Sequence, residues 1–382
     1  MNRLVLLILL ITHHMHAEEF LYPVAAYRDH EGFTKVLVLY QKSLEHIELW
    51  QWDLATQRAH KALLSSFTPA GVRMLPDMTG FSFVDSGRIR IKEFCKRSPK
   101  AIDIYEPVYD IGVVEWADNE TGYFSAKMRD HYSIFSVTRD GDTCCLVTKP
   151  GADCMYPKKI GEYLFYIERT AVQTDDLFAP GIDTKEHYTY RIMKTAYQGD
   201  ATAKVPPLCV ANFDTRPIVF LTMVSAREGF VIEHATVIDK HDPVVIFLYH
   251  RLLCDEAGMW SHRYLFSFSV PSELLLPTSN RLYESLLPLL PRPIHNYIYY
   301  VDLVPGNDGS ACLFPCRYSL HTFMKEVIPH SGIHHSFAPF FVDSLLLYGG
   351  TLISASAPYM TLDHDGQVCF QFPVLDFPTD SD

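Results

Sequence analysis

Apolar and polar side chains alternate along Phe81–Phe94, which reads FSFVDSGRIRIKEF. Apolar residues recur at every second position in both halves, at Phe81 and Phe83 and then at Ile89 and Ile91. This period of two is that of a β-strand, because successive strand side chains point to opposite faces. The central DSG sequence contains a glycine, which tolerates the positive φ of a tight turn. The stretch therefore predicts a β-hairpin.

Short segments of similar character recur from residue 33 to the C-terminus, separated by turns rich in Gly, Asp and Asn. No apolar pattern with helical spacing extends over ten residues. Two stretches interrupt the series. Residues 170–186 are polar and acidic and are expected to form a surface loop, and the proline-rich residues 286–294 are expected to form an extended connection. The segments fall into seven groups, at 33–54, 63–94, 113–137, 144–193, 218–270, 297–320 and 340–372.

These groups predict an all-β protein with radial repetition of small sheets. Counted with the loops between them, the groups recur at roughly 50 residues each, near the upper end for a propeller blade. Seven groups supply too many strands for one sandwich. We expect a β-propeller of six or seven blades, each a four-stranded antiparallel sheet. The alternative is a pair of tandem β-sandwiches.

Two stretches share an ordered layout of a Pro or Trp, a turn with Asp and Gly, a strand of aromatic residues and a second strand. They are LPDMTGFSFVDSGRIRIKEF at 75–94 and VEWADNETGYFSAKMRDHYSIFSV at 114–137. This layout resembles that of the TolB-like and WD40-like β-propeller superfamily. The resemblance implies a rigid binding platform, often for another protein, and it implies no catalytic residue.

The N-terminus reads MNRLVLLILLITHHMHAEEF, with Arg3 before an apolar run and Ala17 at a plausible cleavage point. This order is typical of a secretory signal peptide, although a buried N-terminal strand is the alternative. The run is shorter than the ~20 apolar residues of a membrane span. We therefore expect a signal peptide at 1–17, a propeller domain at 18–374 and a disordered tail at 375–382. The mature chain is expected to be secreted or periplasmic, without a transmembrane segment.

The net charge disfavours one class of partner, and the cysteine content bears on disulfide pairing. The net charge of −12 is spread along the chain, which disfavours nucleic acid as a partner because phosphate binding needs a basic face. An oxidising compartment would allow some of the nine cysteines to pair, but most are expected to be buried free thiols. They are Cys95, Cys144, Cys145, Cys154, Cys209, Cys254, Cys312, Cys316 and Cys369.

Signatures of catalysis and metal binding are absent or weak. The sequence contains no G-x-S-x-G, H-E-x-x-H or phosphate-loop motif. His330, His334 and His335 could bind zinc on a helix, but Pro329 and Gly332 favour a connecting loop. Asp363–Gly366 lacks further acidic calcium ligands and is expected to be a hairpin turn. No metal or cofactor is therefore expected. The sequence Asn119-Glu120-Thr121 is a glycosylation sequon on a predicted turn.

One concentration of basic residues stands out in this acidic chain. It comprises Arg88, Arg90, Lys92, Lys96 and Arg97, here called the basic patch, with Lys100 beyond it. The patch could receive an acidic partner, or it could be the solvated face of an outer strand.

The hypothesis that fits these features is an exported propeller that binds another protein. The lack of catalytic motifs disfavours an enzyme, but a site built on the central funnel would leave no linear motif. The alternatives are thus an extracytoplasmic hydrolase or lyase, or a binder of carbohydrate or another small ligand, with its site in the funnel. Convergent charged side chains with shifted pKa values in the funnel would favour an enzyme. The oligomeric state is not predicted.

Overall fold

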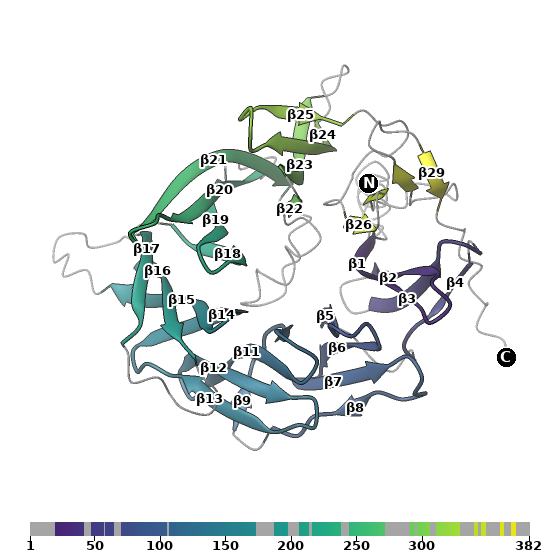
Figure 1. Ribbon diagram of the computed structural model, residues 1–382, viewed down its shortest axis with the longest axis horizontal. Coiled ribbons are helices and arrows are strands. Elements are labelled where there is room, and N and C mark those ends of the chain that lie inside the picture. Colours follow the sequence, from purple (N-terminus) through teal and green to yellow (C-terminus); the bar gives the residue numbers. More distant parts are fainter. Residues whose placement is uncertain are drawn as a thin grey trace, which may run out of the picture.

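The computed structural model describes most of the chain and is drawn in Figure 1. The described residues are 20–41, 47–56, 58–64, 70–104, 107–172, 187–197, 206–213, 216–237, 244–271, 291–294, 296–305, 311–328, 340–342, 345–348, 360–362 and 368–371. The expected signal peptide at 1–17 and the expected tail at 375–382 lie outside these ranges.

The described strands form seven antiparallel sheets arranged in a ring (Figure 1). Each sheet is built from strands that follow one another in the chain, with the first strand nearest the centre and the last at the rim. None of the described residues is helical. The chain is therefore an all-β propeller, as expected from the sequence, and the tandem-sandwich alternative is wrong.

The first four sheets, here called blades 1 to 4, span the N-terminal half of the ring. Blade 1 contains β1 (Phe20–Arg28), β2 (Thr34–Gln41), β3 (Ile47–Asp53) and β4 (Arg58–Lys61). Blade 2 contains β5 (Ala70–Met74), β6 (Gly80–Asp85), β7 (Arg88–Glu93) and β8 (Lys100–Ala101). Blade 3 contains β9 (Val108–Tyr109), β10 (Glu115–Trp116), β11 (Thr121–Met128), β12 (His131–Thr138) and β13 (Thr143–Val147). Blade 4 contains β14 (Ala152–Ile160), β15 (Tyr163–Val172), β16 (His187–Ala196) and β17 (Leu208–Phe213).

Blades 5 to 7 complete the ring. Blade 5 contains β18 (Ile218–Ser225), β19 (Glu228–Val237), β20 (Val244–Cys254) and β21 (Trp260–Pro271). Blade 6 contains β22 (Arg292–Ile294), β23 (Tyr297–Pro305), β24 (Ala311–Ser319) and β25 (Lys325–Val327). Blade 7 contains β26 (Phe340–Val342), β27 (Leu345–Tyr348), β28 (Met360–Leu362) and β29 (Val368–Gln371). β1 of blade 1 lies in contact with β26 and β27 of blade 7, which closes the ring.

Blade 3 has five strands because its innermost strand is split. β9 pairs with one end of β11, at Lys127 and Met128, whereas β10 pairs with the other end, at Tyr123 and Gly122. The intervening Gly112 still donates its backbone N–H to the Ser125 carbonyl oxygen at 2.8 Å. Blade 3 is therefore a four-stranded blade with an interrupted first strand, and it matches the other six in plan.

Blade 2 shows how the ring buries both faces of a sheet. Phe81 and Phe83 of β6 pack in a cluster shared with blade 1, whereas Ile89 and Ile91 of β7 pack in a cluster shared with blade 3. The predicted β-hairpin is confirmed. Both of its faces lie against neighbouring blades.

Several strands were missed or placed wrongly in the sequence-based grouping. β1, β14 and β17 were not predicted, and β13 closes blade 3 instead of opening the fourth group. The expected extended connection at 286–294 ends in β22, an edge strand that contains Pro293. Proline is tolerated in an edge strand because such a strand pairs with a neighbour on one side only. The larger part of the expected surface loop at 170–186 lies outside the described residues.

The described residues contain no helix with both the length and the hydrophobicity needed to cross a membrane.

Candidate functional site

A cleft of about 1300 Å³ lies between blades 1 and 2, and we call it the interblade cleft. Its walls come from the turns that join β1 to β2 and β5 to β6, and from the chain that follows β4 and β7. The two turns and the chain that follows β7 lie at the same end of their up-and-down blades, whereas the chain that follows β4 leaves that strand toward the other end. The size of the cleft is sufficient for a peptide segment or a small ligand.

The base of the cleft is aromatic and parts of its rim are apolar. Tyr27 at the end of β1 stacks on Phe94 just beyond β7, with ring centroids 4.3 Å apart. Leu64 and Met78 also line the cleft, and they are 54% and 50% exposed. Exposed apolar side chains beside a recess are typical of a surface that binds another molecule.

Cationic side chains outnumber anionic ones in the lining. Two aspartates, Asp29 and Asp77, contribute negative charge, and two histidines, His30 and His60, also line the cleft. The lysines and arginines are Arg28, Lys35, Lys61, Lys92, Lys96 and Arg97. The cleft is therefore a positive recess on an acidic protein, which favours an anionic ligand.

The lysines of blade 1 are held by carboxylates. Lys35 lies between Asp53 and Asp29, with 3.3 Å between its Nζ and the Asp29 carboxylate. Burial opposes the charged ammonium, but hydrogen bonds to Asp53 and Asp29 outweigh it and raise the pKa of Lys35. Lys61 forms an ion pair of 3.1 Å with the buried Glu48. These two cations are thus largely neutralised within the protein.

The blade 2 wall is different. Lys96 pairs with Glu93 at 2.8 Å, and this hydrogen bond lowers the pKa of the Glu93 carboxyl. Arg97 is exposed and has no side-chain partner among the described residues. Lys92 is buried and donates hydrogen bonds to the backbone carbonyl oxygens of Glu93 and Lys96. Burial lowers the pKa of the Lys92 ammonium.

The structure divides the predicted basic patch. Lys92, Lys96 and Arg97 line the interblade cleft, whereas Arg88 and Arg90 do not. Arg88 is exposed at the opposite end of β7, and Arg90 donates to Asp85 at 3.0 Å. The five residues therefore do not form one continuous surface. The opposite wall of the cleft and its charged side chains come from blade 1, and no linear pattern around residues 88–97 could have indicated them.

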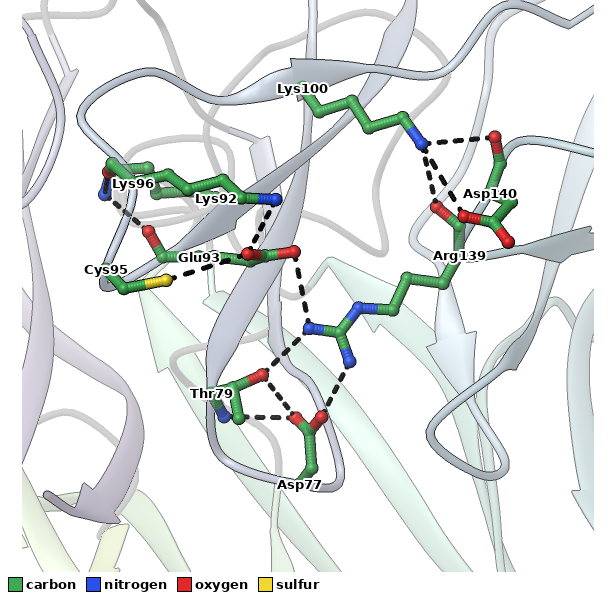
Figure 2. Close-up of polar contacts among 9 residues, drawn as sticks. All are labelled: Asp77, Thr79, Lys92, Glu93, Cys95, Lys96, Lys100, Arg139 and Asp140. Atoms are coloured by element: carbon green, nitrogen blue, oxygen red, sulfur yellow. Dashed lines mark hydrogen bonds and ion pairs between the residues drawn. The ribbon is translucent and has the colours of Figure 1, made fainter. Parts of the chain in front are cut away.

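Arg139 supports the blade 2 wall from blade 3 (Figure 2). Its guanidinium pairs with Asp77 at 2.6 Å, donates to the Thr79 hydroxyl at 2.9 Å and lies 3.6 Å from Glu93. Burial would raise the pKa of Asp77, but the Thr79 backbone N–H and Arg139 overcome it and lower that pKa. The β5–β6 turn and the end of β7 are thereby fixed relative to each other.

A second cluster of charges joins the innermost strands of blades 2, 3 and 4. Glu115 of β10 accepts from Arg73 of β5 at 3.2 Å and from Lys158 of β14 at 2.6 Å. Burial would raise the pKa of Glu115, but the two cations lower it to about 2. Burial also lowers the pKa of Lys158, although Glu115 partly offsets this effect. This Arg73–Glu115–Lys158 triad is the kind of convergent charge near the ring centre that would favour a funnel site.

The remaining features predicted from the sequence are the candidate metal ligands and the glycosylation sequon. No group of three potential metal ligands occurs among the described residues, and His330, His334, His335 and Asp363–Gly366 lie outside them. Asn119 of the sequon is exposed in the β10–β11 turn.

The cysteines differ from the expectation that most are buried. Of the seven that the structure describes, Cys154 and Cys316 are buried, whereas Cys95, Cys144 and Cys209 are exposed. Cys95 lines the interblade cleft, and its thiol lies 3.7 Å from the Glu93 carboxylate.

No protein-family model matches the chain, and no curated protein matches its sequence. Solved structures with a similar fold are more numerous. A puromycin-hydrolysing peptidase from Mycobacterium tuberculosis aligns with 94% of this chain at 10% identity and a TM-score of 0.61. An oligogalacturonate lyase from Vibrio parahaemolyticus aligns with 87% of this chain and 88% of its own length, at 9% identity and a TM-score of 0.53.

TolB from Acinetobacter baumannii is a third similar structure, at 11% identity and a TM-score of 0.44 over 81% of this chain and 63% of its own. This chain spans about half the length of the peptidase, since the alignment covers 54% of that protein. At these identities the likeness extends to the propeller fold alone. The peptidase and the lyase agree with the propeller fold that residues 75–94 and 114–137 led us to expect.

Proposed function

We propose that this protein is an exported binding module whose partner is another protein. The interblade cleft receives a segment of that partner that carries both carboxylates and apolar side chains. The expected signal peptide at 1–17 directs the chain out of the cytoplasm, and the propeller supplies a rigid frame for the cleft.

The observation that carries this proposal is the composition of the cleft. Arg97 and Lys96 lie on one wall, the Tyr27–Phe94 stack forms the base, and Leu64 and Met78 expose apolar surface. Cations favour an acidic segment and exposed apolar groups favour burial of its apolar side chains. An ordinary solvated surface would not combine the two in a recess.

The test uses a fluorescent peptide of glutamates and leucines and a matched peptide with glutamine in place of each glutamate. We expect the full-length mature protein to bind the acidic peptide and to discriminate against the neutral one. Arg97→Glu should weaken binding about three- to tenfold, since exposed ion pairs are each worth ~0.2–1 kcal/mol and reversal adds repulsion. Arg88→Glu is the matched control, because Arg88 is also exposed on blade 2 but lies outside the cleft.

Equal weakening by Arg88→Glu and Arg97→Glu would show a general charge effect and would contradict a site in the cleft. Equal affinity for the two peptides would remove the acidic-partner proposal.

A second candidate function is catalysis in the central funnel, and the Arg73–Glu115–Lys158 triad favours it. A lysine whose pKa is lowered beside a carboxylate is a recurrent feature of active sites, and it recurs in structural ion-pair networks as well. The peptidase and the lyase with similar propellers suggest two substrate classes for an activity assay. These are amides such as puromycin, and oligogalacturonates. Turnover of either one that disappears in Lys158→Met would replace the binding proposal, whereas absence of turnover would leave the triad a structural link between blades.

A further inference from the structure

Lys92 differs from Lys35 of the interblade cleft and from Lys158 of the triad, which are also largely removed from solvent. It is 8% exposed, yet no carboxylate oxygen lies within ion-pair distance among the described residues. Its ammonium donates to two backbone carbonyl oxygens, those of Glu93 at 2.8 Å and of Lys96 (Figure 2). By contrast, Lys35 and Lys158 each have a carboxylate partner.

The fold places this cation in the wall of the interblade cleft. Lys92 pairs with Phe81 across the β6–β7 ladder, and Phe81 packs toward blade 1. Since directly paired residues share a face of the sheet, Lys92 faces blade 1 as well. A lysine ammonium carries three N–H donors, of which the carbonyls occupy two. One donor therefore remains, on a positive charge that has no ion-pair partner among the described residues and lies in a site that is costly for a lone ion.

We propose that Lys92 is the carboxylate anchor of the interblade cleft, where it binds one acidic side chain of the partner segment. This inference rests on the proposed function and adds to it the atom that recognises the ligand. Lys96 and Arg97 flank the anchor, and the Tyr27–Phe94 stack accommodates the apolar part of the same segment.

Binding at such an anchor is coupled to protons. In the unbound protein, burial lowers the pKa of Lys92, and a bound carboxylate raises it by favouring the charged ammonium. The contribution of Lys92 to affinity is therefore complete below the pKa of the unbound protein and is lost as the pH rises through the pKa of the complex. Between these two values, binding takes up a proton.

Other charged or titratable groups also face Lys92 or line the same cleft, and the experiment must separate them. They are Glu93, Cys95, Lys96 and Arg97 at the end of β7, Asp77 in the β5–β6 turn, and Arg28, Asp29, His30, Lys35, His60 and Lys61 across the cleft on blade 1. Lys92→Met removes the ammonium, keeps most of the side-chain length and leaves all of these groups in place.

The test is calorimetric titration of the full-length mature protein with the glutamate–leucine peptide, at pH 7 to 10, in two phosphate-free buffers of different ionisation enthalpy. We expect the wild-type protein to take up protons on binding in part of this range. Lys92→Met should bind the peptide at least about tenfold more weakly, as is usual when a charge-assisted hydrogen bond is lost. The proton uptake on binding should also fall. Arg88→Met is the control and should match the wild type in both readouts.

The outcomes separate this inference from the proposed function. If Arg97→Glu weakens binding while Lys92→Met leaves affinity and proton uptake unchanged, the cleft binds acidic segments but Lys92 is not the anchor. If the wild type does not bind the peptide at all, both proposals fail. Circular dichroism and the thermal midpoint of Lys92→Met establish that the variant is folded, so that lost affinity reports on the site.

Discussion

At the scale of single residues, burial separates side chains that the sequence presents as alike. Lys92 and Arg97 are both cations of the predicted basic patch, yet one is buried against blade 1 and the other is exposed. Cys154 and Cys144 are both strand cysteines, yet only Cys154 is inside. The sequence could identify residue types and their alternation, but not which neighbour covers each side chain, because that neighbour belongs to another blade.

Cysteine reactivity should follow this division. Burial raises the pKa of Cys154 and of Cys316 to about 12, and alkylation requires the thiolate. We expect iodoacetamide at pH 8 to label Cys95 and Cys144 in the folded protein, and to label Cys154 and Cys316 only after unfolding. Peptide mapping by mass spectrometry measures each site, and equal labelling of Cys154 and Cys95 in the native protein would contradict the assignment.

At the scale of elements, the β6–β7 hairpin depends on two glycines for different reasons. A Cβ on Gly80 would lie 2.3 Å from the backbone oxygen of Lys92, so the close approach of the two strands requires glycine. Gly87 has nothing within 4 Å of such a Cβ, but its φ is +72° in the tight turn. One position is limited by space and the other by backbone conformation.

Substitutions at the two glycines should therefore have different effects. Gly80→Ala is expected to lower the free energy of unfolding by about 1–3 kcal/mol, the usual cost of an overpacked site. Gly87→Asn should be nearly neutral, since asparagine tolerates the left-handed conformation. Urea denaturation of both variants measures the difference, and a Gly87→Asn protein less stable than Gly80→Ala would refute this account.

The hairpins could be predicted from sequence because their turns and alternation are local. β14 could not, because it combines Asp153, Pro157 and two lysines in a strand. Its charges are satisfied by other strands, as when Asp153 accepts from Arg169 and from the Tyr132 backbone N–H of blade 3. Pro157 lies where the pairing of β14 with β15 shifts register, beside Tyr156 with a φ of +55°. A bulge at an edge strand accommodates proline without loss of a ladder hydrogen bond.

At the scale of the whole molecule, contacts between blades decide both stability and the candidate site. The recurrence of short strands predicted the propeller, including six or seven blades, because each blade repeats one plan. The interblade cleft could not be predicted, since its walls come from segments as far apart as Tyr27 and Arg97. The same holds for the triad, whose members lie on three blades.

The triad should make the free energy of unfolding depend on pH in the acidic range. The pKa of Glu115 is lowered to about 2 in the folded protein, so its stabilising effect is present above its ordinary value and is lost as pH falls toward 2. Glu115→Gln should cost roughly 3 kcal/mol at pH 7, because it leaves two cations without their carboxylate.

The difference between Glu115→Gln and the wild type should narrow as pH falls, because protonation of Glu115 mimics the amide. Urea midpoints of both proteins at pH 7, 4 and 2.5 measure this trend. Glu120→Gln, at an exposed position in the next turn, is the control and should follow the wild type throughout. A difference that is independent of pH would contradict the ion-pair explanation.

Because each described sheet draws its strands from one continuous segment, the two ends of the chain are joined where β1 touches β26 and β27, without a shared sheet. No described strand is shared across that seam, whereas every other neighbouring pair of blades is also tethered by the chain itself. Under mechanical load or heating, we therefore expect blades 1 and 7 to separate from each other first, while each blade stays folded. A crosslink across this seam would raise resistance to unfolding more than a crosslink between any two sequential blades, since it converts an open string of sheets into a covalently closed one.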